Sequence, residues 1–215
     1  MSFLNQLKSQ ATELKNQQAV VAPDLTANTA STEAACQTVA RYLRDLAMHL
    51  TVIEPSGPHF TLDGKTPWPA MKLSDFHSDS RKKILRDKEV FDTMAMGWTI
   101  TPKMGVAVGG AVTVTFIPEV ERIQQILTFA HVEHERKETR HPQRNSLQSV
   151  RFEYTTEARG NVSIKADHDA AQLVFRVANA NGFGVTTSTI SAEKITSDLM
   201  DELAKLIVAQ PSTFA

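Results

Sequence analysis

Four side chains of metal-binding type lie close together in the sequence: His131, His134, Glu138 and His141. If one helix carries them, successive residues turn by about 100°, and the four side chains fall within an arc of roughly 80°. His131 and His134 could then bind one metal ion, with Glu138 as the third ligand. Three protein ligands and one open position are typical of a hydrolytic zinc site. The spacing therefore suggests a metal-dependent hydrolase as one function of the chain.

The same segment also has features that oppose a metal site. His131 and His141 are ten residues apart, about 15 Å along a helix, which is too far for one ion. Pro142 disfavours a helical conformation at the residue before it. Zinc-protease signatures place two histidines four residues apart around a glutamate, and His131 and His134 do not have this spacing. The Glu, Lys and Arg residues of 133–140 favour the alternative of a solvent-exposed helix with ion pairs.

Other catalytic patterns do not occur in the sequence. There is no Gly-x-Ser-x-Gly elbow and no phosphate-loop spacing, and the single cysteine, Cys36, excludes a redox pair within the chain. Because catalytic residues can also converge from distant loops, the sequence leaves open whether the chain is an enzyme. No cofactor is expected.

A regular apolar stripe predicts a helix from about residue 32 to residue 53. Its members repeat at intervals of three and four residues: Cys36, Val39, Leu43, Leu46, Leu50 and Ile53. This repeat is typical of a helix–helix seam, and Val39, Leu43, Leu46 and Leu50 are therefore candidate partner-binding residues. The alternative is that the stripe packs on the chain's own sheet or first helix, which the shortness of the repeat favours. Cys36 lies on the stripe and is predicted to be a core residue rather than a nucleophile.

A second helix is predicted before this one, at residues 2–18, where apolar residues again follow a helical spacing. Residues 19–30 contain Pro23 and several Thr and Asn residues and are interpreted as a linker, with Ser31 or Thr32 as the cap of the next helix. The predicted organisation is an N-terminal helix and linker at residues 1–30, and a single α+β domain at residues 31–215.

The C-terminal third of the chain predicts four short strands and a final helix. Apolar and polar residues alternate in four runs, which are separated by turn residues: 150–155, 162–167, 172–178 and 183–190. One antiparallel sheet with one solvent-exposed face explains this alternation. The final helix is predicted to begin at Ser191, and its apolar stripe must be buried against the strands.

The middle of the chain is harder to interpret. Asp79 or Ser80 could cap a helix, whereas the residues of 90–100 alternate as in a strand. Residues 104–117 predict a glycine-rich strand that bends, and a helix is predicted from Pro118. Trp68 stands between two prolines and is predicted to fill the edge of a core.

Together these elements predict an α+β fold. A curved antiparallel sheet of about six strands packs on a long C-terminal helix, with an N-terminal helical pair. The order of elements resembles that of helix-grip domains, a resemblance of fold alone. It implies a groove for an apolar ligand between the sheet and the C-terminal helix.

The charge balance bears on the partners. Lys and Arg total 23 against 24 Asp and Glu, for a net charge of -1, and this disfavours nucleic acid despite a basic run at residues 81–88. No run approaches 18 apolar residues, so no membrane-spanning helix is expected. The first residues do not resemble a secretory signal, and a single cysteine fits a reducing compartment, so we expect a cytoplasmic protein.

The leading hypothesis from the sequence is a non-catalytic binding or assembly protein. It would form a homo-oligomer or bind a protein partner through the N-terminal helices, or bind an apolar small molecule under the C-terminal helix. The alternative is a metal-dependent hydrolase that uses His131, His134 and Glu138.

Overall fold

The computed structural model describes residues 24–214, so the helix predicted at residues 2–18 lies outside the described residues. The described chain begins with the helix α2 (Leu25–Ile53) and continues through the long strands β1 (Met71–Leu85) and β2 (Lys88–Pro102). The elements that follow are β3 (Gly109–Val114), α3 (Ile117–Phe129), β4 (His134–Arg140), β5 (Leu147–Thr155), β6 (Ala158–Asp167), β7 (Gln172–Ala178), β8 (Val185–Ser191), a 3₁₀ turn (Ala192–Lys194) and α4 (Ser197–Ile207). The α+β class and the antiparallel pairing predicted from the sequence are confirmed.

The helix α2 has 29 residues and begins earlier than the sequence predicted. Its N-cap is Asp24, whose carboxylate accepts hydrogen bonds at 3.1 and 3.0 Å from the backbone N–H groups two and three residues later. An aspartate satisfies the free donors of a first turn as well as Ser31 or Thr32 would. Residues 25–30 are therefore helical rather than part of a linker.

Five antiparallel strands form the larger sheet, in the order β1-β2-β6-β7-β8. β1 and β2 make a hairpin of two 15-residue strands, which is closed by Arg86 and Asp87. These two residues have φ angles of 51° and 61°, as a tight hairpin turn requires. A helix beginning at Asp79 or Ser80 is therefore wrong, and the strand predicted from residues 90–100 is confirmed.

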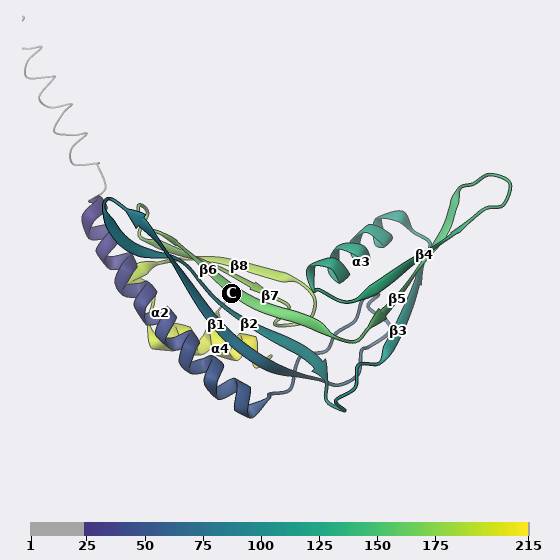
Figure 1. Ribbon diagram of the computed structural model, residues 1–215, viewed down its shortest axis with the longest axis horizontal. Coiled ribbons are helices and arrows are strands. Elements are labelled where there is room, and N and C mark those ends of the chain that lie inside the picture. Colours follow the sequence, from purple (N-terminus) through teal and green to yellow (C-terminus); the bar gives the residue numbers. More distant parts are fainter. Residues whose placement is uncertain (1–23, 215) are drawn as a thin grey trace, which may run out of the picture.

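A smaller sheet has the order β3-β5-β4, and α3 lies over it (Figure 1). β5 therefore belongs to a different sheet from β6, although the sequence suggested one sheet. The helix predicted from Pro118 is confirmed, but it ends at Phe129. Its expected continuation into the charged segment is wrong, because that segment pairs with β5 as the strand β4. The described residues thus form eight strands in two sheets rather than about six in one.

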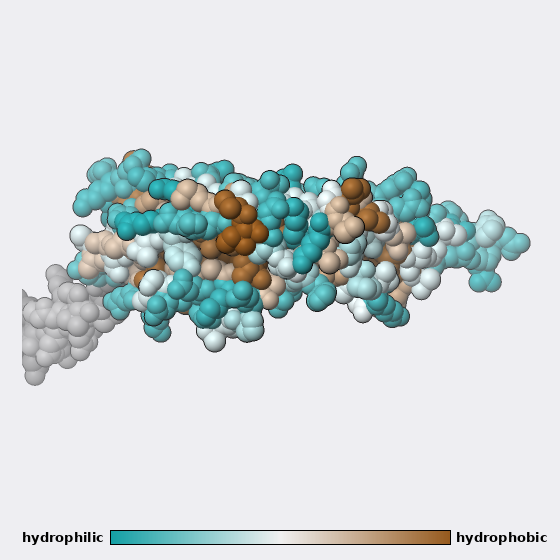
Figure 2. Space-filling model, turned by 90° about the horizontal axis from the view of Figure 1, so that it is seen from below, coloured by the Kyte–Doolittle hydropathy of each residue, from teal (hydrophilic) through white to brown (hydrophobic). Residues whose placement is uncertain are grey.

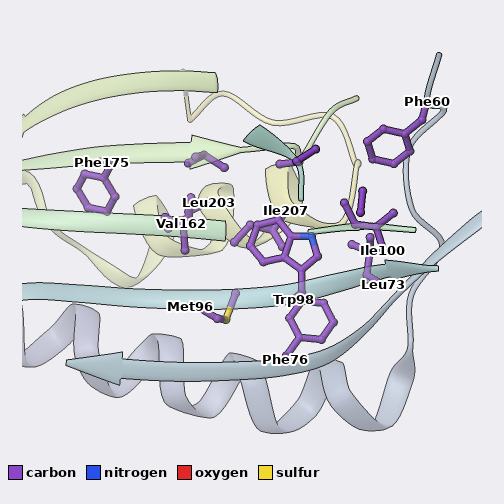
Figure 3. Packing of buried hydrophobic residues seen from close by; sticks show 14 of the residues in the cluster. Phe60, Leu73, Phe76, Met96, Trp98, Ile100, Val162, Phe175, Leu203 and Ile207 are labelled. Carbon is purple, nitrogen blue, oxygen red and sulfur yellow. The ribbon is translucent and has the colours of Figure 1, made fainter. Parts of the chain in front are cut away.

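The main core lies where α2 and α4 cover one face of the five-stranded sheet (Figure 1). Figure 3 shows Met96, Trp98 and Val162 of the sheet in the same cluster as Leu203 and Ile207 of α4. All five side chains are at most 2% exposed. Together with the burial of Val39 and Leu43 of α2, this burial fixes both helices against the sheet, because removing such a side chain from a packed core leaves an unfilled cavity.

The long helix of the fold is the N-terminal α2, not a C-terminal helix. α4 has 11 residues and begins at Ser197, after the N-cap Thr196, whose hydroxyl accepts a hydrogen bond from the N–H of Leu199 at 3.2 Å. The predicted start at Ser191 is wrong because this residue still pairs with β7 as the last residue of β8.

The face of the large sheet opposite α2 and α4 carries small and polar side chains. One row across the five strands consists of Asp79, Ala95, Ser163, Arg176 and Thr187. A sheet with one apolar and one polar face is what the alternation in the sequence predicted. The polar character of this face leaves the core on the side of α2 and α4.

An aromatic cluster joins the segment before β1 to the smaller sheet. Trp68 is buried, and its ring stacks on Tyr154 of β5 with centroids 5.6 Å apart. Phe183, in the loop between β7 and β8, approaches the same indole edge-on at 5.0 Å. The prediction that Trp68 fills the edge of the core is confirmed. Because this cluster joins β5 of the smaller sheet to the segment before β1 and to the β7–β8 loop, it connects the smaller sheet to segments that flank the larger one.

Glu202 of α4 ties down the end of the described chain. Its carboxylate accepts hydrogen bonds from Lys205 Nζ at 2.5 Å and from the backbone N–H of Thr213 at 2.7 Å. The next residue, Phe214, is buried and packs edge-on against Phe175 at 5.3 Å. The hydrogen bonds from Lys205 and Thr213 lower the pKa of Glu202 to about 2.

We expect Glu202 to make the stability depend on pH. Because its pKa is lowered in the folded state, ionised Glu202 stabilises the fold at pH values above the ordinary carboxyl pKa of 4.5. This stabilisation is lost as the pH falls toward about 2. The Glu202→Gln variant should therefore lose less stability than the wild type between pH 5 and pH 2, as measured by urea unfolding at several pH values. Equal pH dependence of the two proteins would contradict this role. Asp63, whose pKa is also lowered to about 2, should leave a residual dependence in the variant.

Candidate functional site

The three predicted metal ligands do not come together in the structure. His131 follows α3 in a left-handed turn with a φ of 53°, whereas His134 and Glu138 lie on β4. Residues four apart on a strand share a face but are separated by about 13 Å. Within residues 24–214, no three His, Cys, Asp or Glu side chains form a group that could hold a metal ion.

His134 and Glu138 already have partners of their own. The two ring nitrogens of His134 lie 2.8 Å from the carbonyl oxygen of Val132 and 2.8 Å from the side-chain amide of Gln124. Glu138 accepts hydrogen bonds from Arg140 and Arg136, and these guanidinium groups hold its pKa below the ordinary value. Its negative charge is thus balanced by two arginines on the same strand.

The predicted partner-binding stripe of α2 is used inside the chain. Val39, Leu43 and Leu50 are buried against the large sheet, and Leu46 is half-buried. A partner could reach these side chains only if α2 left its sheet. The stripe therefore packs on the chain's own sheet, which is the alternative that the sequence left open.

Cys36 lies on the same buried stripe and is completely inaccessible, so its prediction as a core residue is confirmed. Burial, and secondarily the charge of Glu33, raises the pKa of its thiol to about 12. A thiol that stays protonated and inaccessible is a poor nucleophile.

A different part of α2 exposes apolar side chains. Met48, Val52 and Ile53, at the C-terminal end of the helix, are 58%, 85% and 65% exposed. We call these three residues the α2 tip patch. The view from below, the side of α2 and α4, shows hydrophobic atoms gathered near the middle of a largely hydrophilic surface (Figure 2). Exposed apolar side chains that adjoin one another are typical of a contact surface.

A second exposed apolar segment is the loop between β2 and β3. Met104, Val106 and Val108 are all at least half exposed. The strand predicted for residues 104–117 forms only at Gly109–Val114. This loop therefore presents apolar side chains to solvent from a segment that is neither helix nor strand.

The basic run of residues 81–88 lies at the tip of the β1–β2 hairpin and is largely paired with acids. Lys82 contacts Glu89 at 3.0 Å, and Lys83 contacts Asp92 at 2.8 Å. Arg86 forms an ion pair with Asp169 in the turn after β6. Pairing of this kind favours a solvated, charge-balanced surface over a site for phosphate groups.

The space predicted for an apolar ligand is filled by the chain itself. Met200, Leu203 and Ile207 of α4 are completely buried in the main core, and Phe214 covers Phe175 next to them. An apolar hollow of about 320 Å³ lies elsewhere, between the start of α2 and the β1–β2 hairpin, with lining residues that include Leu25, Leu85 and Val90.

Sequence reasoning missed the surface at the outer edge of β8. Strand order places β8 at one side of the large sheet, next to β7 alone. Its sequence, Val-Thr-Thr-Ser-Thr-Ile-Ser, has no charged residue and no proline. Charged residues and proline are the usual protection of a sheet edge, and their absence was the one signal in the sequence.

No family model, no curated protein and no solved structure matches this chain. Across residues 24–214, the structure contains no helix that is long and apolar enough to cross a membrane.

Proposed function

We propose that this chain is a non-catalytic assembly protein that binds a protein partner through the α2 tip patch. The observation that carries the proposal is the exposure of Met48, Val52 and Ile53 at the end of a helix that is otherwise anchored to its sheet. Because the backbone of a helix fixed in this way is already ordered, binding costs little further backbone entropy, which favours affinity.

The size of the patch limits the kind of partner. Burying one such side chain contributes about 1.5–3 kcal/mol, so three of them could anchor a small interface. Arg44, Asp45 and His49 are exposed on the same part of α2 and would form a polar rim. The expected partner is therefore a protein with an apolar groove of the width of a helix.

The proposal predicts that charges on the patch abolish partner binding without affecting the fold. We would purify the tagged full chain from its source cells as the wild type and as the double variant Val52→Lys, Ile53→Lys, and quantify bound proteins by mass spectrometry. At least one protein should be depleted more than about tenfold in the variant, because a 1.4 kcal/mol loss already gives a factor of ten.

The matched control is the double variant Gln37→Lys, Thr38→Lys. These residues are adjacent, exposed and on the same helix, and they receive the same charges. Depletion in the Val52 and Ile53 variant alone supports the proposal. If all three proteins retain the same bound set, the α2 tip patch is not the partner surface.

A further inference from the structure

β8 differs from the other sheet edges in having no protection. β1 is partly covered by the segment before it, through hydrogen bonds from Gly57 N–H to Met71 O and from Leu73 N–H to Pro55 O, and it contains register shifts. β4 carries Glu, Arg and Lys residues along its length, and β3 is short and begins with two glycines. β8 pairs with β7 over all its seven residues without a bulge, and five of the seven are β-branched.

The hydrogen-bond pattern shows which backbone groups of β8 are free. Ala192 N–H bonds to Ala171 O and Asn179 N–H bonds to Gly184 O, in the register of the β7–β8 ladder. Because such bonds alternate along an antiparallel pair, the even-numbered residues of β8 bond to β7 and the odd-numbered ones point outward. The residues whose backbone N–H and C=O groups point away from β7 are Val185, Thr187, Thr189 and Ser191. Within residues 24–214, no hydrogen bond reaches them.

We propose that the outer edge of β8 pairs antiparallel with β8 of a second copy of this chain, about a two-fold axis midway between the two Ser188 residues. This inference rests on the proposed assembly function but uses a different surface and names the partner. The two sheets would then form one continuous sheet of ten strands. Since the axis is perpendicular to the sheet, α2 and α4 of both copies lie on the same face.

The sequence of β8 is suited to pairing with itself. Thr187 and Thr189 flank Ser188, so Thr187 of one copy would face Thr189 of the other. Thr–Thr pairs across strands are favourable. Thr186 would face Ile190, and these are again two β-branched side chains. A two-fold axis brings identical residues of the two copies together, so a charged residue near it would face a like charge. β8 contains no charged residue, and this repulsion does not arise.

The first test separates the backbone edge from the side chains. Wild-type full chain should sediment as a dimer of about 47 kDa, twice the chain mass of 23.7 kDa. Thr187→Pro removes one outward N–H and no bond to β7, so it should give a folded monomer at the concentration where the wild type is dimeric. Thr187→Val keeps that N–H and should remain a dimer. A double variant Thr187→Lys, Thr189→Lys should be monomeric through charge repulsion, and it replaces the proline variant if that one does not fold.

The second test determines the register. In the proposed pair, Ser188 faces Ser188 as a non-hydrogen-bonded pair, with Cα atoms about 4.5 Å apart, a separation that a disulfide can span. Ser188→Cys should therefore form a disulfide-linked dimer on non-reducing gels, and Thr186→Cys should not, because its copies would lie about 13 Å apart. The native Cys36 is buried and does not compete.

The outcomes distinguish this inference from the proposed function. A monomeric wild type, a dimer that persists in both the Thr187→Pro and the double lysine variants, or a dimer without the Ser188 disulfide would overturn the β8 pairing. If the Val52→Lys, Ile53→Lys variant loses its partner but still forms the β8 dimer, both proposals stand. If that variant becomes monomeric and the double lysine variant at Thr187 and Thr189 stays dimeric, the α2 tip patch is the self-association surface and β8 is not.

Discussion

Replacing Leu43 with Asp is expected to unfold the protein, whereas Val52→Asp on the same helix is expected to leave it folded. Leu43 is 1% exposed in the main core, and Val52 is 85% exposed. Truncating a buried leucine costs about 2–5 kcal/mol, and burying an unpaired carboxylate adds several more. This sum approaches the whole stability of a typical domain, which is about 5–15 kcal/mol. An exposed substitution near a helix end should cost less than about 1 kcal/mol.

The measurement is circular dichroism with urea unfolding of the two variants and the wild type. Leu43→Asp should show little native signal or a midpoint far below that of the wild type, and Val52→Asp should be close to the wild type. A folded Leu43→Asp variant of wild-type stability would contradict the packing of α2 on the sheet. It would return Leu43 to the role of a partner-binding residue, as the sequence allowed.

The elements that the sequence predicted well are those with short-range periodicity. The strands near residues 150–178 alternate clearly because one face of each is buried and the other is not. The outer half of β1 lies at a sheet edge and is largely polar and exposed on both faces, so the sequence shows no two-residue period there. β4 was interpreted as a helix for a related reason, since its charged residues are exposed on both faces.

The division into two sheets was not predictable from local patterns. β5 has the alternation of β6, but it pairs with β3 and β4, and pairing partners are set by contacts distant in the sequence. The same holds for the edge position of β8. The arc that would bring His131, His134 and Glu138 together requires a helix, whereas the structure has His131 in a turn and the other two on a strand.

The α2 tip patch could have been predicted in part. The spacing of the apolar stripe placed Leu43 and Leu50 on the buried side, and it excluded Met48 and Val52, which lie off the stripe. Large apolar residues outside the stripe of an amphipathic helix are the signal that was available. Ile53 could not be assigned, since it continues the stripe but lies at the last residue of the helix, past the cover of the sheet.

Gly160→Ala is expected to destabilise the protein by about 3 kcal/mol, within the range of overpacked cores. Gly160 of β6 lies beside Trp98 of β2, and a Cβ at this position would be only 2.2 Å from the indole ring. Trp98 is 2% exposed and stacks on Phe76 with centroids 6.0 Å apart, so it has little room to move. The absence of a side chain at residue 160 is therefore what allows the tryptophan to lie flat on the sheet.

Gly109→Ala is the matched control, because a Cβ there meets nothing within 4 Å and the residue also lies in a strand. Removing a glycine from such a position reduces the entropy of the unfolded chain, so its effect should be near zero or stabilising by up to about 1 kcal/mol. Urea unfolding followed by tryptophan fluorescence measures both variants. Equal stability of the two would mean that Trp98 moves aside without cost. It would then contradict the close contact of the Trp98 indole with Gly160.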